Sequence, residues 1–276
     1  MDSMNPLLTK IIVIVAAVAI VVPATYLLAS QYTSSQSEAN PFSYVPLHSE
    51  VVAEAHLNST AIYLFVSNGS AGAVLPFTIN EIELFANATY ANSSSPLQIT
   101  PYTSYMSQTV YSVSNFSISS LGSSGFTLNN SILAIVSQSL PGNNSTLFAA
   151  NAGTAGMVIG NLGAVKDSIS SAGSGNTFSS VATSYLDGTS NYSFYVKPKN
   201  LSSVNYITGN ISDGHSNVYV SLSGNTSLGS FHFVKNGTYN VTVSSKPGSL
   251  MVTVTGNYTL SELVGYVTQY LGKVGA

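Results

Sequence analysis

The sequence has 276 residues, of which 45% are hydrophobic and only 6% are charged, and its formal net charge at pH 7 is −3. This hydrophobic content excludes a disordered stalk, because enough apolar surface is present to form a core. Ordinary globular proteins carry about a quarter charged residues, so the polar surface here must consist of Ser, Thr, Asn, Gln and Tyr. Arg, Cys and Trp are absent, so there is no disulfide framework, and we expect neither a cofactor nor a nucleic-acid partner.

The run Ile11–Ala29 is apolar and contains no charged residue. As a helix with about 1.5 Å rise per residue it would reach about 28 Å, close to the thickness of a bilayer core. Lys10 precedes it and no basic residue follows until Lys166, so the charge bias keeps the N-terminus inside. We therefore expect residues 1–30 to be a membrane anchor or signal, and the chain to be a single-pass cell-membrane protein with its C-terminal bulk extracellular.

Three interpretations of this run are open. A retained anchor is favoured by residues 26–29, which continue the run beyond Pro23 to full spanning length, and proline is tolerated within membrane helices. A cleaved signal would end its apolar region at Pro23, and the protein would then be secreted. A type IV pilin-like leader would be cut just ahead of the run, although residues 9–11, Thr-Lys-Ile, lack the small residue usual before such a cut.

Signals for asparagine-linked glycosylation, Asn-X-Ser/Thr, are the strongest motif in the chain. Fifteen of the 24 Asn residues lie in such a signal, more than the Ser and Thr content gives by chance, and all of them follow the apolar run. The predicted attachment residues are Asn58, Asn68, Asn87, Asn92, Asn115, Asn129, Asn143, Asn144, Asn191, Asn200, Asn210, Asn225, Asn236, Asn240 and Asn257. This distribution predicts N-glycans on the exported part of the chain.

The low charge also fits an acidic exterior. At about pH 2 to 3 most of the ten carboxylates would be protonated, because their ordinary pKa values are about 4. Self-repulsion would then stay small, and few ionised carboxylate pairs would be lost. A glycan-covered surface that needs no charge for solubility explains the same composition, and the two explanations are compatible.

Residues 31–45 are polar and lack periodicity, which predicts a flexible linker. Residues 46–148 are expected to form a β-rich domain, because His48, Glu50, Glu54 and His56 alternate with apolar residues at the period of a half-buried strand. Further runs rich in Val, Ile, Tyr, Phe and Thr predict strands at Thr60–Ser67, Ala73–Ala86, Gln108–Ser119 and Ser131–Gln138.

Residues 149–187 form a Gly/Ala-rich connector in which Met157, Val158, Leu162, Val165 and Ile169 approximate helical spacing. This pattern predicts a small-residue central helix packed against a sheet or crossing between two subdomains. A membrane-inserting peptide is the alternative interpretation of the same small apolar residues.

Residues 188–276 have the pattern of an antiparallel β-sandwich that ends in a helix. Strands are predicted at Tyr192–Lys197, Val204–Ile211, Val218–Ser223, Ser230–Lys235, Tyr239–Ser245 and Leu250–Gly256. The dipeptides Asp187-Gly188 and Asp213-Gly214 each precede a strand that contains Tyr, so we expect the same hairpin turn twice.

An amphipathic helix is predicted at the C-terminus. Thr259 and Glu262 fit a capping box, and the apolar stripe consists of Leu260, Leu263, Val264, Val267, Leu271 and Val274. The stripe either belongs to the core of the sandwich or docks on another subunit, in which case Tyr266 and Tyr270 would extend the contact.

Motifs that carry chemistry are few. The sequence has no Cys nucleophile, no phosphate-binding Gly-Lys-Ser/Thr loop, no His-Glu-x-x-His and no Gly-x-Ser-x-Gly. His48-x-Glu50 and Glu54-x-His56 have a spacing that could hold a metal on one strand face, but an exposed strand face explains them as well. Glu81 and Glu83 are the candidates for paired-carboxylate hydrolysis on one strand face. His215 and His232 have the character of ordinary surface or core residues, and we assign no catalytic, cofactor-binding or metal-binding residue.

The combination of an N-terminal apolar run, no Cys, little charge, abundant Ser, Thr, Asn and Tyr, and dense glycosylation signals resembles cell-surface proteins of thermoacidophilic archaea. Among these are pilin-like, thread-forming and envelope-associated glycoproteins. The resemblance implies a non-enzymatic structural or adhesive role in the envelope or on a filament, with self-association or surface-layer partners. The alternatives are a secreted acid-active hydrolase that uses paired carboxylates, and a virion glycoprotein of an archaeal virus.

Overall fold

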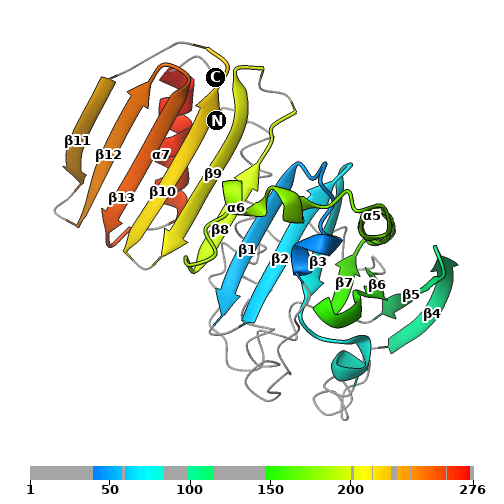
Figure 1. The fold of residues 1–276 in the computed structure, drawn as a ribbon. Helices are drawn as coiled ribbons and strands as arrows, with labels where there is room; N and C mark the ends of the chain where they lie inside the picture. Colours follow the sequence, from blue (N-terminus) through cyan, green and yellow to red (C-terminus); the bar gives the residue numbers. More distant parts are fainter. Residues whose placement is uncertain are drawn as a thin grey trace. The chain divides into compact units, whose positions relative to one another are not determined.

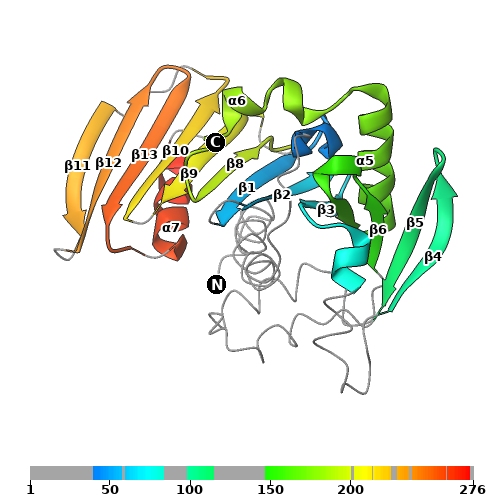
Figure 2. The same cartoon turned by 60° about the horizontal axis from the view of Figure 1, so that its bottom comes forward.

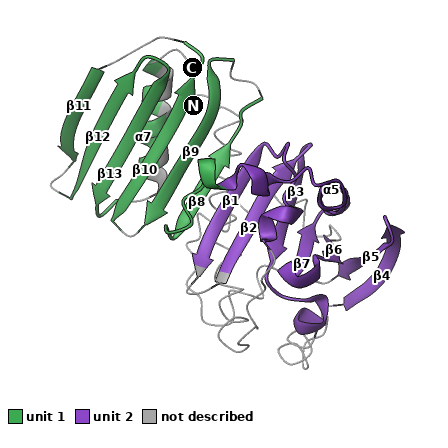
Figure 3. Ribbon diagram, in the orientation of Figure 1, with its two compact units in different colours: residues 1–12, 183–276 green, residues 13–182 purple. Residues whose placement is uncertain are grey.

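The structure is a computed structural model that describes residues 40–57, 60–83, 98–114, 147–199, 202–212, 214–224, 229–235, 238–258 and 260–273. The chain divides into two compact units (Figure 3), unit 2 with residues 13–182 and unit 1 with residues 1–12 and 183–276. The apolar run Ile11–Ala29 lies outside the described residues. Within the described part, no helix is both long and apolar enough to span a membrane.

Unit 2 contains seven strands in the order β1-β2-β3-β7-β6-β5-β4 (Figures 1 and 2), and all its neighbouring pairs are antiparallel. The strands are β1 (Val51–Leu57), β2 (Thr60–Ser67), β3 (Ser70–Leu75), β4 (Gln98–Tyr105), β5 (Gln108–Ser114), β6 (Leu147–Asn151) and β7 (Met157–Gly160). The prediction of β2 is confirmed at both ends, and β5 begins at the predicted residue. The predicted strand Ser131–Gln138 lies outside the described residues.

The core of unit 2 lies between its sheet and helix α5 (Leu162–Ser174). Phe65 of β2 is 1% exposed. A Cβ added to Gly72 on β3 would lie 2.6 Å from the ring of Phe65 and 3.0 Å from Ala164 of α5. Gly72 therefore lets the Phe65 ring lie across the sheet directly beneath the helix.

Strand β1 differs from the predicted half-buried strand, because it is buried on both faces. Val51, Ala53 and Ala55 are at most 4% exposed, and so is Glu54 on the opposite face. A strand covered on both sides reads as a continuous apolar run rather than an alternating one. Glu54 and His56, the polar residues of the alternation that lie on β1, are therefore not an exposed face.

The predicted strand Ala73–Ala86 is only partly correct. Strand β3 ends at Leu75, and residues 79–83 are helical. The Thr78 backbone N–H donates to Glu81 Oε2 at 2.6 Å, and the Glu81 N–H donates to Thr78 Oγ1 at 3.3 Å, which is a capping box. Glu81 and Glu83 therefore lie on a helical turn and not on one face of a strand.

The central helix begins later than the Gly/Ala pattern predicts. Met157 and Val158 belong to strand β7, and the turn η2 (Gly153–Ala155) precedes it. Helix α5 begins only after Asn161, whose side chain accepts a hydrogen bond from the Ala164 N–H at 3.1 Å. A helix packed against a sheet is thus present, but its first predicted turns are a strand.

Part of the predicted linker is ordered. The short helix η1 (Pro41–Tyr44) begins after Asn40, which caps it by accepting from the Phe42 N–H at 3.0 Å. The Phe42 ring lies 4.4 Å from that of Tyr63, edge to face, and 6.1 Å from Phe178 of η3 (Phe178–Ser180). Aromatic packing therefore fixes this segment to the body of unit 2.

Unit 1 contains six antiparallel strands in the order β11-β12-β13-β10-β9-β8. They are β8 (Tyr192–Val196), β9 (Val204–Ser212), β10 (His215–Leu222), β11 (Gly229–Lys235), β12 (Tyr239–Lys246) and β13 (Ser249–Gly256). All six were predicted, with boundaries that differ by no more than three residues. A mainly β, antiparallel fold is therefore confirmed.

The second layer of unit 1 is the C-terminal helix α7 (Leu260–Lys273), which lies behind the sheet in Figure 1. The rings of Tyr270 and Phe231 lie 5.0 Å apart, and those of Tyr266 and Phe233 lie 5.6 Å apart. The predicted amphipathic helix is confirmed, and both tyrosines pack on its own sheet. A helix thus takes the place of the second sheet that a sandwich would supply, since all six described strands of this unit lie in one sheet.

The two Asp-Gly dipeptides have different structures. His215 pairs with Ser212, which leaves a two-residue turn in which Gly214 has φ +72°, as the hairpin prediction requires. Asp213 itself lies outside the described residues. Asp187 follows the short helix α6 (Ala182–Tyr185) rather than a strand, so the first hairpin prediction is wrong.

Candidate functional site

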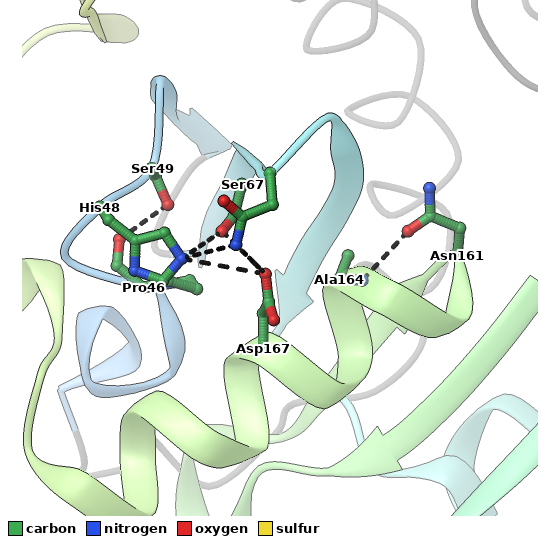
Figure 4. Close-up of polar contacts among 8 residues, drawn as sticks. Pro46, His48, Ser49, Ser67, Asn161, Ala164 and Asp167 are labelled. Atoms are coloured by element: carbon green, nitrogen blue, oxygen red, sulfur yellow. Dashed lines mark hydrogen bonds and ion pairs between the residues drawn. The ribbon is translucent and has the colours of Figure 1, made fainter.

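A cluster of polar side chains joins three segments of unit 2 (Figure 4). His48 lies in the turn before β1, Ser67 ends β2, Asn68 begins the β2–β3 turn and Asp167 lies on α5. The turn positions Asn68 with φ +50° and is followed by Gly69 with φ +73°. Asn-Gly favours such a two-residue turn, because both residues tolerate positive φ.

The cluster is centred on two atoms, His48 Nε2 and Asp167 Oδ2. Ser67 Oγ lies 2.9 Å from His48 Nε2 and donates to Asp167 Oδ2 at 3.0 Å. Asn68 Nδ2 lies 3.1 Å from His48 Nε2 and donates to Asp167 Oδ2 at 3.0 Å. The hydroxyl of Ser67 and the amide of Asn68 thus both donate to the Asp167 carboxylate.

Ser, His and Asp lie together here without the geometry of a catalytic triad. In a triad the carboxylate binds the imidazole nitrogen that faces away from the serine. Asp167 Oδ2 instead lies 3.9 Å from His48 Nε2, the same nitrogen that faces Ser67. Ser67 is also 0% exposed, so its hydroxyl cannot reach a substrate. The cluster therefore fastens the β2–β3 turn and the turn before β1 to α5.

Glu54 and His56 form a second polar group on β1. Glu54 is 4% exposed, and its Oε1 lies 2.9 Å from His56 Nε2. Tyr63 pairs with Glu54 across β1 and β2, and burial, followed by the Glu54 charge, raises the pKa of the Tyr63 hydroxyl. The structure thus overturns the exposed strand face predicted for Glu54, because this carboxylate is an interior group held beside a histidine.

The structure brings Glu54 and His56, one of the two proposed metal pairs, together as an ion pair. His48 lies in a turn and contacts Asp167, whereas Glu54 and His56 lie on β1. Among the residues that the structure describes, no three His, Asp or Glu side chains are close enough to share a metal ion.

The hydrolysis candidates Glu81 and Glu83, and the carboxylate of Asp187, lie in separate local structures. Glu81 caps the helical turn 79–83, and Glu83 is exposed on it. Asp187 accepts hydrogen bonds from the Thr189 and Ser190 hydroxyls, both at 2.7 Å, and from Asn210 Nδ2 at 3.2 Å. The Asp187 carboxylate therefore organises the loop before β8.

These hydrogen bonds, above all that from the Thr189 hydroxyl, hold the pKa of Asp187 below its usual range. A carboxyl with a lowered folded-state pKa stabilises the fold above its unfolded pKa, and this contribution is lost as the pH falls through the folded value. We expect Asp187→Ala to lower the free energy of unfolding by about 1 kcal/mol at pH 7. The difference should shrink below about pH 3, where the unfolded carboxyl, with a pKa near about 3.9, is protonated.

Urea denaturation at both pH values measures this effect. Asp187→Asn is the matched control, because it keeps one acceptor oxygen but cannot ionise. We expect a smaller loss at pH 7 that also shrinks as the pH falls, because both variants lack the ionisable carboxyl of the wild type. Equal losses for Asp187→Ala at pH 7 and pH 2.5 would contradict the assignment.

A third polar group ties α7 to the sheet of unit 1. The buried Tyr239 hydroxyl donates to Glu262 Oε1 at 3.0 Å and lies 3.1 Å from the Tyr266 hydroxyl. The hydrogen bond with Tyr266, burial and the hydrogen bond to Glu262 raise the pKa of Tyr239. Glu262 was predicted as a partner of Thr259 in a capping box, but Thr259 lies outside the described residues.

Five of the predicted glycosylation residues lie in the described part of the chain. Asn68, Asn191, Asn240 and Asn257 are exposed, whereas Asn210 is half-buried and donates to Asp187. The remaining ten lie outside the described residues, and these are Asn58, Asn87, Asn92, Asn115, Asn129, Asn143, Asn144, Asn200, Asn225 and Asn236. A glycan on Asn68 would leave one N–H on Nδ2, so it would compete with the contacts of that atom to His48 and Asp167.

Ser67 and Asp167 were not singled out from the sequence. They lie 100 residues apart, and neither belongs to a motif. The Asn68-Gly69 dipeptide, as a hairpin signal, was the one local feature that could have located this end of the cluster.

The fold and these polar groups define a mainly antiparallel β protein of two units. No protein-family model matches the chain, and neither a curated protein nor a solved structure matches it.

Proposed function

We propose that this chain is an extracytoplasmic, N-glycosylated structural or adhesive surface protein, associated with a cell envelope or a filament and held at the membrane by Ile11–Ala29. A thermoacidophilic archaeal cell or an archaeal virion is the proposed setting. The observation that carries the proposal is the coincidence of dense glycosylation signals with a surface of little charge. Four of the five described attachment residues are exposed, which supports the same conclusion.

The polar groups support a structural rather than a catalytic role. Glu54 is held beside His56, Glu81 caps a helical turn, Asp187 organises a loop and Glu262 binds Tyr239. A secreted hydrolase of the paired-carboxylate type needs two such groups converging on a substrate. Each of these four carboxylates instead stabilises its own local structure.

Native protein tests the proposal. We expect it in the membrane fraction, accessible to protease added to intact cells or virions, and with glycopeptides at most of the fifteen signals. Unmodified peptides over most of these signals would remove the main support for the proposal. Recovery in the soluble interior of the cell would contradict it.

Self-association is the second part of the proposal, and one of the two edge strands, β11, supports it. The outer strand β4 carries Pro101 and a register shift between Pro101 and Thr103, two features that hinder pairing with another chain. Strand β11, the outer strand in the order of unit 1, pairs with β12 without any register shift. Light scattering of the purified protein tests this part, and a monomer at high concentration, with and without glycans, would contradict it.

A further inference from the structure

One face of the unit 1 sheet is covered by α7, and the opposite face, which Figure 1 views, carries mostly uncharged polar side chains. Alternation along the strands and their register assign the side chains to this open face. Between β10 and β11 its register positions carry hydroxyl, amide, imidazole and apolar side chains, among them Asn217, Tyr219, Met251, Asn240, Thr242 and Val234. Lys246 is the one Lys, Asp or Glu among these positions.

Many polar side chains of the open face bind one another. Thr253 donates to Asn217 at 2.7 Å, Asn217 Nδ2 lies 2.9 Å from His215, and His232 lies 3.0 Å from Thr242. Rows of hydroxyl and amide groups thus cross the strands. They present further lone pairs and protons to any neutral, hydroxyl-rich ligand.

Exposed apolar side chains interrupt these rows. Val234 is 58% exposed, Met251 40% and Tyr219 37%. A cover that removes this apolar area from water would stabilise the unit.

Val234 lies directly opposite Asn240, because the two residues are partners in the β11–β12 register. Cβ atoms of such partners are about 5 Å apart. Asn240 is exposed and belongs to the signal Asn240-Val241-Thr242, of which Thr242 lies on the same face. A sugar attached to Asn240 Nδ2 would therefore begin beside the most exposed of these apolar side chains.

We propose that the N-linked glycan on Asn240 folds back over Val234 and covers the open face of unit 1. A sugar ring has an apolar C–H face and a rim of hydroxyls. Its C–H face can bury Val234 while its hydroxyls bind Thr242 and Thr255 beside it. Further sugars extend toward Met251 and Tyr219. This inference rests on the glycosylation proposed above and identifies its structural role.

Three of the other described attachment residues lack this arrangement. Asn68 Nδ2 is held by His48 and Asp167, and Asn210 Nδ2 by Asp187. Asn257 follows the end of β13, and none of the exposed large apolar side chains in the described residues is its strand partner. Asn257 is therefore the matched control: a glycan there would be exposed but would have no exposed apolar side chain opposite it.

The experiment is a double-mutant cycle in the full chain, purified from a host that glycosylates it. Site occupancy is measured by glycopeptide mass spectrometry, and the Tm is measured for wild type, Asn240→Gln, Val234→Ser and the double variant. We expect Asn240→Gln and Val234→Ser each to lower the Tm by about 3 °C, and the double variant to lower it by no more than either one. Val234→Ser should leave occupancy unchanged, and its effect should disappear in protein from a host that does not glycosylate.

The same cycle with Asn257→Gln should be additive. Additive Tm shifts for Asn240→Gln and Val234→Ser would overturn the inference. An unoccupied Asn240 beside occupied signals elsewhere would also overturn it and leave the proposed function intact, whereas no occupancy at any signal would remove both. A change in oligomeric mass on Val234→Ser, with no coupling to Asn240, would identify a second copy of the chain as the cover instead.

Discussion

Removal of Leu260–Ala276 is expected to unfold unit 1. Helix α7 buries Leu263 and Tyr270, which are 2% and 4% exposed, against a sheet face whose inward side chains are themselves buried. Truncation of one large core side chain costs about 2 to 5 kcal/mol, so loss of the helix should cost more than about 5 kcal/mol. This is comparable with the whole stability of a domain, about 5 to 15 kcal/mol. Urea denaturation followed by circular dichroism should show that the transition of unit 1 is lost.

Point variants on α7 control for the severity of the truncation. Leu263→Ala should lower the free energy of unfolding by about 3 kcal/mol. Gln269→Ala changes an exposed position of the same helix and should alter it by less than about 0.5 kcal/mol. An unchanged Tm after truncation, together with lost self-association, would show instead that the helix is a surface for a partner.

The strands of unit 1 could be predicted because their sheet has one covered and one open face. Along β12 the residues alternate strictly, with Val241 and Val243 buried and Asn240 and Thr242 exposed. This two-residue period is the signal on which strand prediction from sequence depends. The helix that forms the second layer was predicted as well. The sequence did not predict that this helix replaces the second sheet of a sandwich.

Unit 2 was harder to predict, because β1 is buried on both faces and other strands contain proline or small residues. Strand β4 contains Pro101, which argues against a strand unless it lies at an edge, and β4 is an edge strand. Met157 and Val158 of β7 continue the helical spacing of Leu162 and Val165 on α5, so the local pattern cannot separate the two elements. The distinction comes from pairing of β7 with β3 and β6, which is not local information.

The polar cluster of unit 2 could not be predicted from the sequence either, because its residues are far apart along the chain. Asp167 meets Ser67 and Asn68 across about 100 intervening residues, and the order of the strands brings α5 to the β2–β3 turn. The burial of Glu54 could not be predicted from local sequence either. It depends on what covers the sheet, whereas the alternation of Glu54 with apolar residues predicts exposure.

Gly156→Ala is expected to be the most damaging single substitution of a small residue in unit 2. Gly156 precedes β7 with φ +106°, and an added Cβ would lie 2.1 Å from the Leu75 carbonyl oxygen and 2.8 Å from the Phe77 nitrogen. Both neighbours are backbone atoms, which cannot rotate away as a side chain can. Strain at positive φ and displacement of the end of β3 should together cost about 4 kcal/mol.

Gly175→Ala separates backbone strain at positive φ from the steric contact of an added Cβ. Gly175 ends α5 with φ +74°, but an added Cβ would meet nothing within 4 Å, so backbone strain alone applies. We expect it to cost about 1 kcal/mol. Urea denaturation of both variants measures the difference, which isolates the contact of Gly156 with the β3 backbone. Equal losses would mean that the chain before β7 can move away from Leu75 without cost, and that β7 is held in the sheet by its strand pairing alone.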